Sequence, residues 1–162
     1  MAASVDNLRA IAGLIASFLI CFGAARVGVL FTDLSVSTWY PSVVKPAWTP
    51  SGNLIGGIWT VLFTLMAFAA WLVWLNNGAA HRRKALLLFV GQLVLNVTWS
   101  AMFFGLRSPG LAAIEIIVLW MAILATVVAF ARVSKVASAL MVPYLLWVAF
   151  AAVLNVKIWS MN

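Results

Sequence analysis

The chain has 162 residues, of which 66% are hydrophobic and 8% are charged, and its mean hydropathy is +1.14 with a formal net charge of +7. This composition excludes a water-soluble protein and predicts an integral membrane protein. A bilayer core needs roughly 20 apolar residues per helix, so about five spans fit, and residues 1–162 are expected to form one all-α transmembrane domain. The basic residues gather at the ends of apolar runs, which indicates topology signals and lipid headgroup contacts and no nucleic-acid partner.

Five apolar runs predict membrane-spanning helices at residues 8–31, 53–75, 83–105, 109–131 and 136–159. The first run is long enough to span and lacks a cleavage site, so we expect an uncleaved helix rather than a signal peptide. It holds Cys21, the only cysteine, so no internal disulfide can form. The last three connections are short, which predicts antiparallel neighbours in a compact five-helix bundle.

The only long connection, residues 32–52, includes the segment WYPSVVKPAWTPSG from Trp39 to Gly52. Its three prolines prevent a regular helix. Trp39, Tyr40 and Trp48 supply large rings with polar edges, which suit a membrane interface or a cover over a ligand. We therefore expect this segment, called the lid loop below, to cover a binding site.

Basic residues are distributed unevenly between the two ends of the predicted bundle. The end that holds the N-terminus carries six of them, Arg9, Arg82, Arg83, Lys84, Arg132 and Lys135, and the lid end carries four, Arg26, Lys45, Arg107 and Lys157. The positive-inside rule then predicts a cytoplasmic N-terminus and a lid loop on the opposite face. The short N-terminus without an Arg-rich leader favours a bacterial inner membrane.

Aromatic and amide side chains recur at helical spacing on three of the predicted spans. Trp59 and Phe63 are four residues apart near the start of the second span and share one face. The third span places Gln92, Asn96, Trp99 or Ser100, and Phe103 in one stripe, and the fifth repeats the pattern with Tyr144, Trp147, Phe150 and Asn155. Amides in hydrocarbon must face the bundle, so these groups are expected to converge beneath the lid loop.

Each of these features also has a simpler structural explanation. Tryptophans anchor helices at membrane interfaces, and Gln92 and Asn96 can tie helices together without any ligand. Glu115 is the only acidic residue within a span, and it is either functional or a protonated acid bonded to a neighbouring helix. One histidine, one cysteine and no carboxylate cluster predict no metal site, and no cofactor is required. The stripes favour a binding site for a large, flat, apolar ligand with a polar edge.

A set of short motifs, in order along the chain, carries a family resemblance. They are Trp39-Tyr40-Pro41, Lys45-Pro46-Ala47-Trp48-Thr49-Pro50, Ile58-Trp59, Gln92 with Asn96, Trp99, Phe103-Phe104-Gly105, and Pro143-Tyr144-Leu145-x-Trp147 with Leu154-Asn155. Together they resemble the TspO/MBR family of tryptophan-rich sensory proteins, which includes the translocator protein or peripheral-type benzodiazepine receptor. The resemblance covers nearly the whole chain.

The resemblance implies a five-helix bundle, commonly a homodimer, that binds porphyrins such as protoporphyrin IX and, in some members, isoquinoline carboxamide or benzodiazepine drugs or sterols. By motif position it implies ligand contacts from Trp39, Trp48, Trp59, Phe63, Asn96, Phe103 and Trp147. The helical stripes add Gln92, Tyr144 and Phe150 to the expected ligand-binding residues. The sterol motif proposed for the last helix is not matched, because Val156 precedes Lys157 where a tyrosine is needed.

Three functions follow from this interpretation. The first is a membrane receptor or sensor that binds porphyrins and regulates their level or passage. The second is a light- and oxygen-dependent porphyrin-degrading enzyme, in which Trp59 and Trp147 are the catalytic, redox-active residues and Asn96 holds the substrate. The third is a porphyrin or lipid transporter, which would need coupling residues and internal repeats, and only Glu115 is available.

Overall fold

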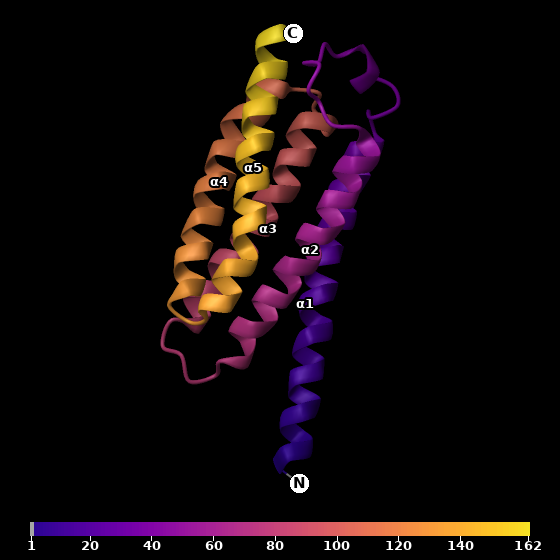
Figure 1. Ribbon diagram of the computed structural model, residues 1–162. Helices are drawn as coiled ribbons and strands as arrows, with labels where there is room; N and C mark the ends of the chain where they lie inside the picture. Colours follow the sequence, from indigo (N-terminus) through magenta and orange to yellow (C-terminus); the bar gives the residue numbers. More distant parts are fainter. Residues whose placement is uncertain (1) are drawn as a thin grey trace.

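The computed structural model describes residues 2–162, and side chains from Asn7 onward. It is a bundle of long helices that run roughly side by side (Figure 1). These are α1 (Ala2–Asp33), α2 (Gly52–Leu75), α3 (Arg82–Ser100), α4 (Pro109–Ala131) and α5 (Lys135–Met161), and no strand occurs within residues 2–162. Each of the five is long and apolar enough to cross a membrane. The predicted all-α transmembrane bundle is confirmed.

The helix bounds differ from the predicted spans mainly at the N-terminus. Helix α1 begins at Ala2 rather than at residue 8, and its N-terminal turns extend past the other helices (Figure 1). Helix α5 continues to Met161, so its last turn reaches the lid loop. Three helices begin where a serine side chain accepts a backbone N–H, which is the usual way to satisfy a helix N-terminus. These caps are Ser51 for α2, Ser108 for α4 and Ser134 for α5.

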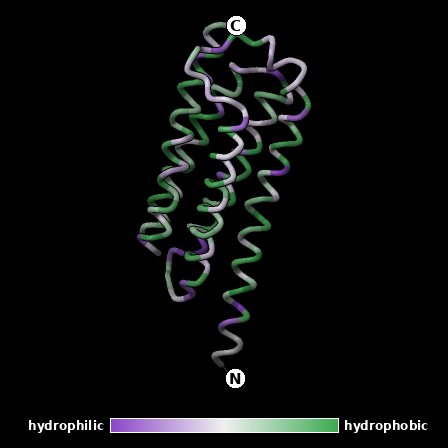
Figure 2. The backbone as a smooth tube through the Cα atoms, turned by 45° about the vertical axis from the view of Figure 1, so that its right-hand side comes forward, coloured by the Kyte–Doolittle hydropathy of each residue, from purple (hydrophilic) through white to green (hydrophobic). Residues whose placement is uncertain are grey.

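Neighbouring helices form a closed ring in the order α1, α2, α5, α4 and α3, and α3 contacts α1 again. Most of the exposed surface along the helices is apolar (Figure 2), as expected of a surface that faces lipid. The interior is filled by small and apolar side chains such as Ala67, Ala70, Met66 and Ile123, each no more than 4% exposed. Small residues allow close helix contact in a membrane, where packing drives association.

Buried polar side chains link helices that are distant in sequence. The Asn155 Oδ1 atom on α5 accepts a hydrogen bond from Trp99 Nε1 on α3 at 2.9 Å, and Asn155 Nδ2 donates to the Pro109 carbonyl of α4 at 2.8 Å. Trp71 Nε1 on α2 donates to the Ala10 carbonyl of α1 at 2.8 Å. The amide of Asn155 therefore joins three helices at the lid end of the bundle.

The end of the third span is not a regular α-helix. Residues Ala101–Gly105 form a π-helical turn, in which the Leu106 N–H donates to the Ala101 carbonyl five residues earlier at 2.8 Å. The chain then turns sharply at Arg107, whose φ of 54° lies in the left-handed region, and α4 begins at Pro109. A π turn is frequent at functional sites. It places Phe103 and Phe104 directly beneath the lid loop.

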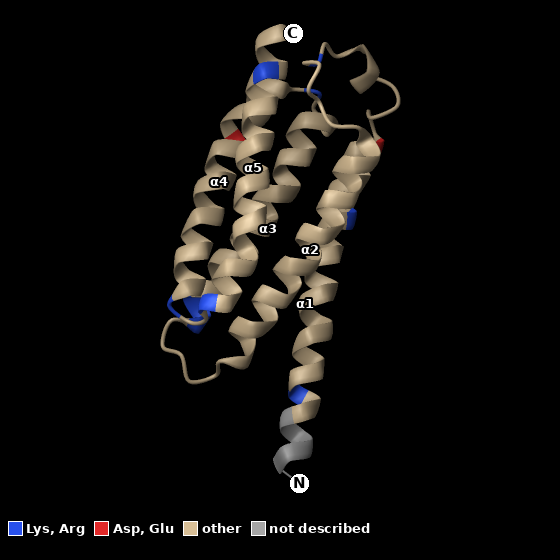
Figure 3. Ribbon diagram, in the orientation of Figure 1, with Lys and Arg blue, Asp and Glu red and all other residues tan. Residues whose placement is uncertain are grey.

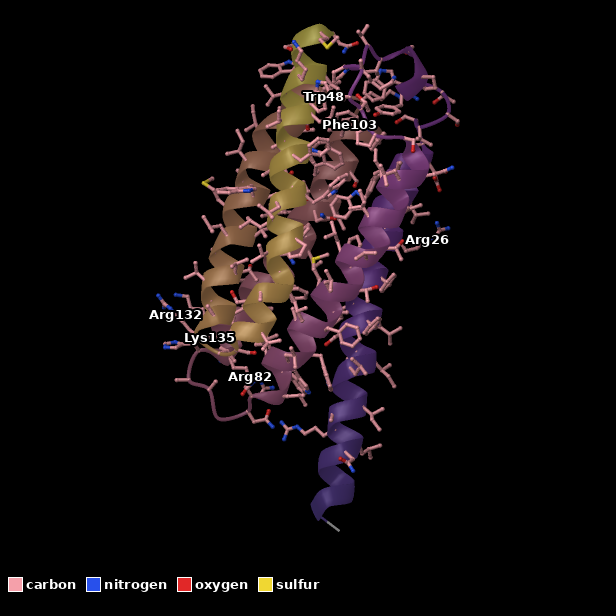
Figure 4. All side chains as sticks on the ribbon, viewed as in Figure 1. Arg26, Trp48, Arg82, Phe103, Arg132 and Lys135 are labelled. Carbon is pink, nitrogen blue, oxygen red and sulfur yellow. The ribbon has the colours of Figure 1, made fainter. Side chains whose placement is uncertain are left out.

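Charged side chains are confined largely to the two ends of the bundle (Figure 3). Arg26 on α1 and the buried Glu115 on α4 are exceptions, and Arg26 is exposed and points away from the bundle (Figure 4). It lies seven residues before the end of α1 at Asp33, or roughly 10 Å at 1.5 Å per residue. A long side chain at that depth reaches the headgroup region by snorkelling.

The Asn155 link predicts a measurable loss of stability on truncation. Replacing Asn155 by Ala removes two interhelical hydrogen bonds and should cost roughly 1–2 kcal/mol, since such bonds average about 0.6 kcal/mol in membrane proteins. Thermal unfolding in detergent measures the effect. Asn76→Ala is the matched control, because Asn76 Nδ2 bonds only the Leu72 carbonyl of its own helix. Equal melting temperatures for the two variants would contradict the role assigned to Asn155.

Candidate ligand-binding site

The base of the lid loop is closed by a group of stacked aromatic rings. Trp39 contacts Phe103 edge-on with ring centroids 5.9 Å apart, and Phe103 stacks on Trp99 at 5.2 Å. Tyr40 meets both Phe103 and Phe104. Phe103 is only 2% exposed. Trp39 of the lid loop and Phe103 at the end of the third span therefore contact each other directly.

The far part of the lid loop contacts α5 instead. Trp48 meets Phe150 edge-on at 5.7 Å, and Phe150 lies 5.3 Å from Trp147 in a tilted arrangement. Trp48 is 48% exposed, so it is held on one side only. Trp48 and Phe103 both lie at the lid end of the bundle (Figure 4). The lid thus covers α3 with Trp39 and α5 with Trp48.

The deepest rings come from α2 and α5. Trp59 lies 5.6 Å from Phe63 and 6.0 Å from Tyr144, which is fully buried. Tyr144 Oη accepts a hydrogen bond from Asn96 Nδ2 at 3.0 Å. Tyr144 and Trp147 are three residues apart and share a face of α5. We call Trp48, Trp59, Phe63, Tyr144, Trp147 and Phe150 the aromatic array.

Two polar groups in this region make no hydrogen bond within the described residues. The indole Nε1 of Trp147 is one of them, and both amide atoms of the fully buried Gln92 are the other. Gln92 lies one turn before Asn96 on α3, on the same face. An unpaired buried polar group typically costs about 1–3 kcal/mol, so each of these groups calls for a partner that the described residues do not supply. Gln92 makes no hydrogen bond to the array itself.

The lid loop is fixed at its base by hydrogen bonds that the sequence patterns did not reveal. The buried Ser35 donates from Oγ to the Phe104 carbonyl at 2.8 Å. Asn162 at the end of α5 bonds Val44 twice, accepting from its N–H at 2.9 Å and donating to its carbonyl at 3.0 Å. Lys45 Nζ donates to the Tyr40 and Val43 carbonyls, both at 2.6 Å, and lies over the Tyr40 ring.

This anchoring leaves one part of the lid loop freer than the rest. The anchored groups lie between Ser35 and Lys45, whereas Trp48 has its ring contact with Phe150. Burial raises the pKa of Tyr40 above its ordinary value of 10, so its phenol stays neutral over the physiological range. The positive charge of Lys45 is therefore the only charge in the contact between Lys45 and Tyr40. The base of the lid loop is thus held by hydrogen bonds, and Trp48 by its ring contact with Phe150.

The structure brings some predicted site residues together and separates others. Of the ten, six form the aromatic array, Asn96 bonds it, Trp39 with Phe103 form a separate group at the lid base, and the amide of Gln92 bonds to neither group. Trp39 also borders a cavity of about 410 Å³ at the rim, between the lid loop, Arg107 and Trp159. Trp99, which stacks on Phe103, is tied to α5 by its hydrogen bond to Asn155. Ser35 and Asn162 gave no signal, because isolated polar residues near a helix end are common.

The remaining acidic and metal-ligating groups do not join this site. Glu115 on α4 is 7% exposed, and its carboxylate makes no hydrogen bond to a described residue. Cys21 is fully buried on α1. Within the described residues, no three His, Cys, Asp or Glu side chains come close enough to hold a metal ion. The side chains of this site can therefore contribute aromatic stacking and hydrogen bonds from amides and indoles.

These features define the protein as a five-helix membrane protein with a tryptophan-lined site beneath a proline-rich loop. The model of the TspO/MBR family matches residues 16–160, and the chain belongs to that family. It is 42% identical over 147 residues to the tryptophan-rich protein TspO of Chlorobaculum tepidum, covering 88% of this chain and 91% of the relative. It is 40% identical over 149 residues to TspO of Archaeoglobus fulgidus, covering 92% and 96%. It is 36% identical over 138 residues to the human translocator protein, covering 84% and 82%. The predicted family resemblance is confirmed.

The anchoring of the lid base predicts that Asn162→Ala loosens the lid loop without unfolding the bundle. The variant loses both hydrogen bonds to Val44. Amide hydrogen exchange in residues 39–50 should become several-fold faster, while exchange in α2 and α4 stays unchanged. Ser160→Ala is the control, because Ser160 bonds only the Lys157 carbonyl of its own helix. Equal exchange of the lid loop in both variants would show that Asn162 does not hold it.

Proposed function

We propose that this protein is a membrane receptor for porphyrins, protoporphyrin IX among them, that binds them at the aromatic array and regulates their level or passage. The observation that carries the proposal is the Trp147 indole N–H, which is shielded from solvent, lies beside the tilted ring of Phe150 and has no partner among the described residues. A planar ligand stacked on the indole of Trp48 would accept this N–H at its polar edge.

The arrangement of the array supports a flat ligand in particular. Trp48 reaches the array through a single edge-on contact with Phe150, so it can separate from α5 without breaking a hydrogen bond. Trp59 packs with Phe63 on α2 and with Tyr144 on α5, and Asn96 holds Tyr144 by a hydrogen bond. Isoquinoline carboxamides and benzodiazepines share the flat aromatic chemistry and serve as competitors. Membership of a family with relatives named tryptophan-rich protein and translocator protein agrees with a ligand-responsive role.

Titration of the purified protein with protoporphyrin IX in the dark tests the proposal. The porphyrin absorption band should show saturable binding, and Trp59→Ala and Trp147→Ala should each weaken it about tenfold, as expected for loss of one stacking surface. Trp159→Ala is the control, since it removes an indole from α5 outside the array, at a 53% exposed position. Undiminished affinity for protoporphyrin IX in both array variants would contradict the proposal.

Illumination of the same complex separates a receptor from the alternative, a porphyrin-degrading enzyme. A receptor gives bleaching no faster than a detergent blank. A new product that needs light and oxygen, and that disappears in Trp147→Phe while binding persists, would assign the degrading activity and make Trp59 and Trp147 catalytic. Protein-dependent flux of porphyrin into vesicles would assign the transporter instead.

We further propose that the protein lies in a bacterial inner membrane with its N-terminus in the cytoplasm. The end of the bundle that holds the α2–α3 and α4–α5 connections carries six basic residues and the lid end four (Figure 3). Buried Cys21 is inert, so single added cysteines report topology cleanly. Gly78→Cys at the α2–α3 connection should react with an impermeant maleimide only after cell lysis, and exposed Ala47→Cys in the lid loop should react in intact spheroplasts. The reverse pattern would overturn this orientation.

A further inference from the structure

A second cavity, of about 460 Å³, lies at the end of the bundle opposite the lid loop. It is enclosed by α1, α2 and α3, with Ala12 and Ala16 on one side and Trp74, Phe89 and Val90 on the other. Its volume is within the range of ligand sites in proteins. None of the residues predicted from the sequence to bind ligand borders it.

The interior of this cavity is apolar along its length. Ser17 is the only hydroxyl in its wall, and its Oγ is already bonded to the Gly13 carbonyl at 2.8 Å. The cavity extends along α1 from Arg9 to Ile20, which is roughly 16 Å at 1.5 Å per residue. Ile20 and Val90 in its wall are 52% and 47% exposed on the lipid-facing side of the bundle. A long, apolar channel that borders lipid matches an acyl chain.

Two arginines converge on shared neutral groups at one end of the cavity, where Arg9 lines the wall and Arg82 lies over the Trp74 ring that also lines it. Arg9 and Arg82 both donate to Asn77 Oδ1, at 3.1 Å and 2.5 Å, and both guanidinium carbons lie over the Trp74 ring, at 5.9 Å and 4.4 Å. Two like charges held this close repel each other unless an anion lies between or beside them. Most of their N–H donors are left free by these contacts.

No described carboxylate is available to neutralise this pair. The two described acidic side chains are Asp33, at the lid end of α1, and Glu115, on the lid half of α4 (Figure 3). Arg83 and Lys84, which follow Arg82 directly, add further positive charge at the start of α3. Basic clusters beside a membrane attract anionic lipid headgroups, and an arginine pair binds phosphate bidentately.

The indole platform beneath the arginines is built by a close helix approach. Gly13 of α1 lies against the Trp74 ring, and a Cβ at that position would fall well inside contact distance of the indole. A side chain larger than that of Gly13 would push the Trp74 ring away from the position in which it contacts both guanidinium groups and lines the cavity. The two arginines, the Trp74 ring and the apolar cavity therefore lie together at this end of the bundle.

We propose that this cavity binds an anionic diacyl phospholipid, with the phosphate held by Arg9 and Arg82 and one acyl chain lying between α1, α2 and α3. The site is distinct from the aromatic array and does not depend on porphyrin binding. Because α1 and α2 form its walls, a bound lipid fixes these two helices against α3 at the end opposite the lid loop.

Native mass spectrometry of the detergent-solubilised protein tests the proposal, with phosphatidylglycerol and phosphatidylcholine of identical chains as probes. The wild type should retain one phosphatidylglycerol in preference to phosphatidylcholine. The Arg9→Gln and Arg82→Gln double variant should lower this preference about tenfold. The control is Arg132→Gln with Lys135→Gln, which removes two charges at the same end of the bundle, away from the cavity. Equal loss in the two double variants would overturn a specific site.

Two further variants keep the test decisive if the arginine variant proves unstable. Ala16→Phe fills the channel from an exposed position on α1 and leaves both arginines in place, so it should abolish retention of phosphatidylglycerol. Arg9→Lys with Arg82→Lys keeps the charge and should retain part of the preference. Full retention by Ala16→Phe would show that no chain enters the cavity.

Discussion

The hydrocarbon core of a bilayer offers no water to backbone amides, and this constraint determines nearly every feature of the protein. Each backbone N–H and C=O must be satisfied within its own segment, so the chain crosses as long helices and confines irregular structure to the ends. The lid loop, the π turn and the capped helix starts all lie at those ends. Polar side chains that enter the interior must likewise find partners, as Asn155 does by joining α3, α4 and α5.

The polar atoms that find no partner are therefore informative. They belong to Gln92 on α3, Glu115 and Trp120 on α4, and Trp147 on α5, three helices that pack on one another in the described bundle. Helices α1 and α2 contribute no such atom among their described residues. Unsatisfied groups of this kind are costly in a membrane, and among these four residues Trp147 is the one that belongs to the aromatic array.

Sequence reasoning reached the helices and the faces that carry aromatic residues, because both depend on local periodicity. Apolar runs and short turns are enough to locate five spans, and the spacing of Trp59 with Phe63 and of Tyr144 with Trp147 places each pair on one face. The contact between Trp48 and Phe150 joins the lid loop to α5, and no local spacing predicts it. The homodimer expected from the family resemblance stays a prediction.

The features that sequence reasoning missed depend on contacts between distant residues or on small changes of helix phase. The hydrogen bonding between Asn162 and Val44 joins residues 118 positions apart in the chain, and no local pattern predicts it. The contact of Gly13 with Trp74 requires a specific approach of α1 to α2, and the paired arginines require Asn77 to lie between them. A glycine in an apolar run has many structural explanations, so its role is visible only in three dimensions.

The π turn at Ala101–Gly105 has a consequence for comparing members of the family. A π turn holds one more residue than the α turn it replaces, so the chain beyond it is rotated by about 100° relative to a regular helix. A relative that lacks this turn would have one residue fewer before the start of α4, although the short connection that precedes α4 would keep its length. In an alignment, a single-residue gap between Trp99 and Ser108 would then record a change of helix winding, and equivalent phenylalanines would occupy different columns.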